Sequence, residues 1–75
     1  MDFNVYCVLD KVSGEYGEPW LSQHDTLAIR KFNYVMKNSP MVATDCSLYC
    51  IGTYSTSTGV VSSFDKPTFV CNYEE

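Results

Sequence analysis

The stretch DTLAIRKFNYVMK, residues 25–37, decides the fold because it has the spacing of one amphipathic helix. Its apolar side chains fall at i, i+4, i+7 and i+8, and Ile29 widens the stripe formed by Ala28, Phe32, Val35 and Met36. Such a stripe is expected to face a sheet. Residues 22–25 match a capping box, although Asp25 could itself be the N-cap. The sequence Asn-Ser-Pro at 38–40 predicts the end of the helix, because proline cannot continue it.

Strand-like segments precede this helix. Residues 3–10 predict a strand, in which successive side chains point to opposite faces. Four of the side chains share one apolar face: Phe3, Val5, Cys7 and Leu9. Tyr6 and Val8 make the opposite face partly apolar as well. Residues 11–18 contain two glycines and predict a turn, and residues 19–21 predict a short strand.

Three further segments follow the helix: a second long strand, a hairpin loop that ends in glycine, and the returning strand, over residues 47–54, 55–59 and 60–64. Residues 67–73 are prone to form a final strand or to pack along an edge. This order predicts an α+β fold, with one helix packed on a small, mostly antiparallel β-sheet. We expect residues 1–75 to form a single domain, with 72–75 as a flexible acidic tail.

Length and composition bound the class of protein. A chain of 75 residues has room for one core, and chains this short bury only about 60% of the surface that their unfolded state exposes. Hydrophobic residues make up 45% and aromatic residues 15%, which is too many for a disordered chain. The N-terminal sequence lacks the pattern of a signal peptide, and no apolar run is long enough to span a membrane. We therefore expect a soluble, cytoplasmic protein without a membrane partner.

Catalysis and metal binding find little support in the sequence. The single histidine, His24, lies near the helix start without a partner motif, and the carboxylates are scattered, so we expect no enzyme activity. The four cysteines do not form two tight Cys-x-x-Cys pairs: they are Cys7, Cys46, Cys50 and Cys71. Without a secretion signal, we expect reduced structural thiols, no metal and no cofactor. A disulfide or a zinc site is the alternative.

The side chains best suited to binding lie on and beside the helix. Arg30, Lys31 and Lys37 are three of the five basic residues in a chain of net charge −4. Tyr34 lies among them, so cations for phosphate and a ring for base stacking share one segment. Trp20, just before the helix, is a further aromatic candidate. The alternatives are a helix face that only confers solubility and, for Trp20, a place at the edge of the core.

Three ordered blocks carry a resemblance to a known family: VYCVLD at 5–10, DTLAIRKF at 25–32, and DCSLYCIGTY at 45–54 with Gly59 following. The second and third are similar to that family's patterns D-x-x-A-x-R-x-F and D-x-x-L-Y-x-I-G-x-Y. The chain thus resembles the small nonstructural protein family of gokushovirus-type microviruses, the tailless single-stranded DNA phages. It departs from that family in its cysteines and in its aromatic, acidic tail.

The resemblance implies a nonstructural role during genome replication, in the host bacterial cytoplasm. The resemblance also implies DNA binding and a part in the switch from duplex copying to single-stranded genome synthesis. It implies no catalytic motif. Arg30 is the matched residue that helix packing does not require: it either contacts phosphate or pairs with a carboxylate such as Asp10 or Asp25. The main alternative is a protein-interaction module that binds a phage or host replication protein without touching DNA.

Two further expectations concern the sheet. Gly52 lies in the middle of a predicted strand, which predicts a bulge or the close approach of another backbone. Strand-prone segments at both ends of the chain predict uncovered edges, and a symmetric dimer covers such edges. We therefore expect a homodimer or a larger homo-oligomer.

Overall fold

A computed structural model describes residues 2–73 of the chain. Within these residues, one α-helix accompanies an antiparallel sheet of five strands, in agreement with the expected fold class. The elements in chain order are β1 (Asp2–Asp10), β2 (Glu15–Tyr16), β3 (Trp20–Ser22), α1 (Asp25–Lys37), the 3-10 turn η1 (Ala43–Asp45), β4 (Cys46–Ser55) and β5 (Val61–Asn72).

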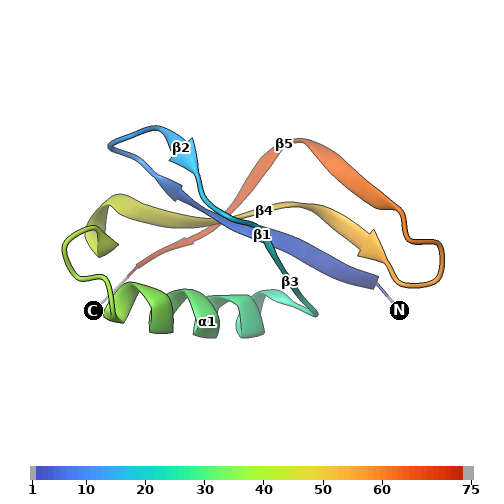
Figure 1. The fold of residues 1–75 in the computed structure, drawn as a ribbon, viewed down its shortest axis with the longest axis horizontal. Coiled ribbons are helices and arrows are strands. Elements are labelled where there is room, and N and C mark those ends of the chain that lie inside the picture. Colours follow the sequence, from blue (N-terminus) through green and yellow to red (C-terminus); the bar gives the residue numbers. More distant parts are fainter. Residues whose placement is uncertain (1, 74–75) are drawn as a thin grey trace.

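The sheet is built around β1 and β4, which pair from Asp2 opposite Ser55 to Asp10 opposite Cys46. Strand β5 lies on the other side of β4, and β2 and β3 pair with different parts of the free side of β1. All of these pairs are antiparallel. Figure 1 shows α1 running along one side of β1 and β4, so the helix covers only one face of the sheet.

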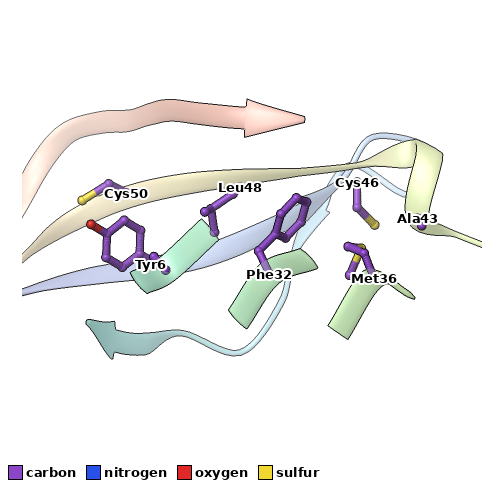
Figure 2. Packing of buried hydrophobic residues seen from close by; sticks show 8 residues of the cluster. Tyr6, Phe32, Met36, Ala43, Cys46, Leu48 and Cys50 are labelled. Carbon is purple, nitrogen blue, oxygen red and sulfur yellow. The ribbon is translucent and has the colours of Figure 1, made fainter. Parts of the chain in front are cut away.

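The core lies between α1 and that face (Figure 2). The buried cluster joins the helix to β1, β4 and η1 through Tyr6, Ala28, Phe32, Met36, Ala43, Cys46, Leu48 and Cys50. Full burial of a large apolar side chain contributes about 1.5–3 kcal/mol, so this cluster is the main source of stability. One helix residue was placed wrongly by the sequence pattern: Val35 is 41% exposed and lies at the margin of the buried stripe.

The start of the helix differs from the prediction. His24 is the N-cap, with an extended backbone and no side-chain capping bond. The capping box predicted over residues 22–25 is therefore wrong, because Ser22 belongs to β3 and pairs with Asn4. Asp25 is the first helical residue, where its carboxylate interacts favourably with the positive end of the helix dipole.

Strand β5 is one element where the sequence predicted two segments, 60–64 and 67–73. Its pairing with β4 is interrupted, since Gly52 lies opposite Ser63 but Cys50 lies opposite Thr68. Residues 64–67 therefore form an arch beside Ile51, and Figure 1 shows this part of β5 rising on the side of the sheet away from the helix. Pro67 is compatible with the arch because proline is tolerated at bulges.

Gly52 lies at a close approach of the β5 backbone to β4. A Cβ atom on Gly52 would overlap the carbonyl oxygen of Ser62 and would lie 3.1 Å from the Cα of Ser63. The register also shifts on both sides of β4 at this point. Both features expected for Gly52, a bulge and a close backbone approach, are confirmed.

The C-terminal end of the described chain packs on the core. Asn72 is the last residue of β5, and the ring of Tyr73 lies edge to face against Phe32 at a centroid distance of 6.4 Å. The expected flexible tail spans residues 72–75, and its last two residues lie outside the described part of the chain.

Candidate functional site

The predicted binding residues on the helix separate into two groups. Arg30, Tyr34 and Lys37 lie at i, i+4 and i+7, on the side of α1 opposite the buried Ala28 and Phe32. All three are exposed, and the side chain of Tyr34 is 71% exposed. We call these three residues the helix stripe. Its ring and its two cations are available to a ligand because the core does not use them.

Lys31 and Trp20 form the second group, on the flank of the helix. The ammonium of Lys31 lies 5.0 Å from the centroid of the Trp20 ring, a cation–π contact. Trp20 packs against the core cluster, and the centroid of its ring lies 6.2 Å from that of Tyr6. Trp20 therefore lies at the edge of the core. Its indole N–H is buried without a hydrogen-bond partner among the described residues. A cleft of about 420 Å³ lies beside this pair, lined also by Val8 and Val35.

Arg30 does not pair with the carboxylates considered for it. Asp25 accepts a hydrogen bond from the hydroxyl of Tyr6, and Asp10 accepts one from the backbone N–H of Val12. Between residues 2 and 73, Arg30 is exposed and forms no ion pair. The carboxylate alternative is therefore wrong for Asp10 and Asp25, and the guanidinium faces solvent.

A hydrogen-bonded chain ties the start of the helix to β1. The hydroxyl of Tyr6 donates to Asp25 Oδ1 at 2.6 Å and accepts from the side-chain amide of Asn4 at 3.0 Å. Burial, followed by the hydrogen bond to Asp25, raises the pKa of Tyr6 to about 12. Tyr6 and Asp25, which belong to two of the three sequence blocks, are thus structural partners rather than ligand-binding groups.

A second exposed surface was not predicted from the sequence. Because side chains alternate along a strand and Tyr6 points to the helix, Val5 and Cys7 point to the opposite face of the sheet. We call this the open face. Three rings form a row across it, with centroid distances of 5.7 Å from Tyr16 to Tyr49 and 5.7 Å from Tyr49 to Phe69. We call this row the aromatic ridge.

The other end of the open face is hollowed. An apolar hollow of about 390 Å³ is lined by Val5, Leu21, Ile51, Tyr54 and Val61, together with Pro19 and Trp20. The ridge lies beside Cys7 and Leu9 in the register of β1, and the hollow lies beside Phe3 and Val5. One sequence signal pointed to such a surface: β1 is apolar on both faces, which is typical of a strand that is covered on both sides.

The cysteines lie mostly in the interior. Cys7, Cys46 and Cys50 are buried and Cys71 is partly buried. Burial is the main cause that raises the pKa of the Cys7, Cys46 and Cys50 thiols, so little thiolate forms at neutral pH. Within residues 2–73, no group of three or more histidine, cysteine or acidic side chains is placed to hold a metal ion.

We predict that the protein has four titratable thiols when it is denatured without reductant, and that at least three of them are protected in the folded state. The physical reason is the burial of Cys7, Cys46 and Cys50, which excludes the reagent and suppresses the thiolate. Thiol titration before and after denaturation measures both numbers. Fewer than four thiols after denaturation, or stoichiometric zinc by elemental analysis, would contradict the prediction.

The fold and these surfaces define a small α+β protein with one covered sheet face, one open sheet face and an exposed cationic helix. A family model for the Phage ORF5 protein matches residues 3–75, and the chain belongs to this family of phage proteins. The match is consistent with the small phage protein that the three sequence blocks indicated. Searches of curated proteins and of solved structures found no match. In the part of the chain that the structure describes, no helix is long and apolar enough to cross a membrane.

Proposed function

We propose that this phage protein is a nonstructural protein of the microvirus type that binds single-stranded DNA and catalyses no reaction. It acts during genome replication in the host cytoplasm, where coating of the displaced strand favours single-stranded genome synthesis. The observation that carries the proposal is Tyr34, whose side chain is 71% exposed between two cations on the side of α1 that faces away from the core. A ring flanked by cations matches the way in which proteins hold single strands, with bases stacked and phosphates paired.

The charges of the chain fit a local site rather than a broad nucleic-acid surface. The net charge is −4, which opposes long-range attraction of DNA, so binding depends on the few cations of the helix. Arg30 and Lys37 face solvent, and Lys31 lies on the flank against Trp20. A base that enters the flank cleft would meet the Trp20 ring and the Lys31 side chain, which supports a secondary contact there.

The second candidate function is a protein-interaction module that binds a phage or host replication protein. The open face favours it, because its most exposed feature is the row of three rings that forms the aromatic ridge. The two functions differ in the surface that they require. DNA binding uses the helix stripe, whereas a protein partner would use the opposite side of the molecule.

We predict preferential binding to single strands over duplex, with little sequence preference, because stacking on Tyr34 requires unpaired bases and phosphate contacts carry no base information. Three cations per subunit, the two of the helix stripe and Lys31 on the flank, give a slope of about −2 for the logarithm of the binding constant against the logarithm of the salt concentration. This value uses roughly −0.7 per neutralised phosphate on single strands. Arg30→Ala should flatten the slope by somewhat less than one unit. Tyr34→Ala should weaken binding by about 1–3 kcal/mol without changing the slope. Fluorescence anisotropy with labelled single strands of several sequences and a labelled duplex, at several salt concentrations, measures all of these quantities.

The matched control is Lys66→Ala, which removes one positive charge from the arch of β5, on the side of the sheet away from the helix. It should leave the salt slope close to that of the wild-type protein. Thermal unfolding of each variant shows whether the fold is kept. If the wild-type protein does not bind single-stranded DNA even at low salt, the DNA proposal is wrong, and the protein-interaction function takes its place.

A further inference from the structure

We propose that the open face of the sheet is the interface of a homodimer, in which the aromatic ridge of one copy fills the apolar hollow of the other. This inference does not depend on the proposed DNA binding, which uses the helix on the other side of the sheet. It also differs from the dimer expected from uncovered strand edges, because the contact is face to face.

The first observation is that the open face is apolar and only partly covered by its own chain. Four large side chains on it are between 47% and 63% exposed: Tyr16, Leu21, Val61 and Phe69. An aromatic side chain has roughly 150–250 Å² to bury, so the half-exposed rings of Tyr16 and Phe69 leave about 150–250 Å² uncovered, and Leu21 and Val61 add to it. A standard interface buries about 800 Å² per partner, of which about 57% is non-polar, or roughly 450 Å². The four exposed side chains therefore supply a large part of the non-polar area of one standard interface, and the side chains that line the hollow supply more.

The second observation is that the paired strand positions facing this side carry no charge, and that the arch of β5 beside them carries one charge of each sign, Asp65 and Lys66. They are Phe3, Val5, Cys7 and Leu9 of β1, Ser47, Tyr49, Gly52 and Tyr54 of β4, and their register partners Tyr16, Leu21, Val61, Ser63, Phe69 and Asn72. In a two-fold dimer each residue of the patch meets the same patch, so any excess charge would repel its own copy. A neutral face on a chain of net charge −4 therefore suits a second copy of that chain better than a polyanion.

The third observation is the shape of the face. The ridge and the hollow lie at opposite ends of β1, as the register shows for Leu9 opposite Tyr16 and Val5 opposite Leu21. A two-fold axis that lies in the interface and runs across the strands places the ridge of each copy over the hollow of the other. Both contacts form together, because a two-fold interface pairs residue i with residue j in both directions. In this dimer the two helix stripes face outward on opposite sides.

Two substitutions test the interface and its arrangement. Phe69→Lys places a positive charge on the ridge, and Val61→Glu places a negative charge in the hollow; both side chains are more than half exposed, at 52% and 63%, so the monomer fold should survive. We expect wild-type protein to sediment as a dimer at micromolar concentration and each variant alone as a monomer. An equimolar mixture of the two variants should form a heterodimer, because the new lysine of one copy then meets the new glutamate of the other.

Val12→Glu is the matched control for Val61→Glu. It makes the same change at a valine that is 78% exposed in the turn after β1, away from the paired strands, and it should remain a dimer. Circular dichroism confirms that each variant is folded. A monomeric wild-type protein, or single variants that stay dimeric, would overturn the proposal. A folded mixture that stays monomeric would overturn the ridge-on-hollow arrangement.

DNA as the occupant of the open face has a separate signature. If bases stack on the ridge, the wild-type protein would be monomeric and Phe69→Ala would abolish oligonucleotide binding while Tyr34→Ala would not. That result would overturn the dimer proposal and would also move the DNA site from the helix to the sheet. A dimer that does not bind DNA would instead overturn only the proposed function.

Discussion

Gly52→Ala is expected to destabilise the protein by about 3 kcal/mol, the upper end of the usual cost of overpacking. The added methyl group would overlap the carbonyl oxygen of Ser62 and would lie 3.1 Å from the Cα of Ser63. Both atoms belong to the backbone of β5, so no side-chain rotation can relieve the overlap. The strand must move away from β4, and its hydrogen bonds to that strand weaken.

Chemical denaturation measures the loss as a decrease in the free energy of unfolding, and thermal melting measures it as a shift of about 4–8 °C per kcal/mol for a domain of this size. Gly17→Ala is the matched control, because a Cβ atom at Gly17 has only the carbonyl oxygen of Val8 near it, at 3.7 Å. That variant should unfold within about 0.5 kcal/mol of the wild-type protein. Equal stability of the Gly52→Ala variant and the wild-type protein would show that β5 does not approach β4 this closely.

Tyr6→Phe is expected to lower the free energy of unfolding by about 1.5–3 kcal/mol, the range for a hydrogen bond to a charged group. The change removes the hydroxyl that donates to Asp25 and accepts from Asn4, while the ring still fills the core. The start of the helix thereby loses its polar contact with β1. Urea denaturation at neutral pH measures the difference.

The same residue makes stability depend on alkaline pH. The pKa of Tyr6 is about 12 in the folded state and about 10 in the unfolded state, so the folded protein holds this proton more tightly. This difference in pKa contributes about 3 kcal/mol to the free energy of unfolding. The contribution is complete below pH 10 and is lost as the pH rises towards 12. The buried thiols, whose pKa values are also raised, act in the same direction.

The difference between wild-type protein and Tyr6→Phe isolates the tyrosine, because the thiols are common to both. This difference should shrink as the pH rises from about 10 to 12. Tyr34→Phe is the matched control, since it also removes a tyrosine hydroxyl but at an exposed position on the helix stripe. Its free energy of unfolding should lie within about 0.5 kcal/mol of that of the wild-type protein. A constant difference between wild-type protein and Tyr6→Phe across this pH range would contradict the raised pKa.

The sequence alone determined the features that depend on short-range patterns. The 3.6-residue period placed Ala28, Phe32 and Met36 on the buried side of one helix and left Arg30 and Tyr34 on the other side. The strand period located β1 and β4, and the glycine at position 52 indicated a close backbone approach. The helix and strand predictions hold because each depends on the geometry of one segment, and the prediction for Gly52 holds because glycine has no Cβ atom to keep another backbone away.

The tertiary structure decided what depends on several segments together. β1 is apolar on both faces, so its sequence could not say which face the helix covers; the contact of Tyr6 with Asp25 and the packing of Phe32 make that choice. Val35 is exposed because it lines the cleft beside Trp20, where the sheet does not cover the helix. The aromatic ridge joins residues 16, 49 and 69, which only strand pairing brings together. Local periodicity carries no information on such long-range neighbours, and for that reason the open face was found only in the folded chain.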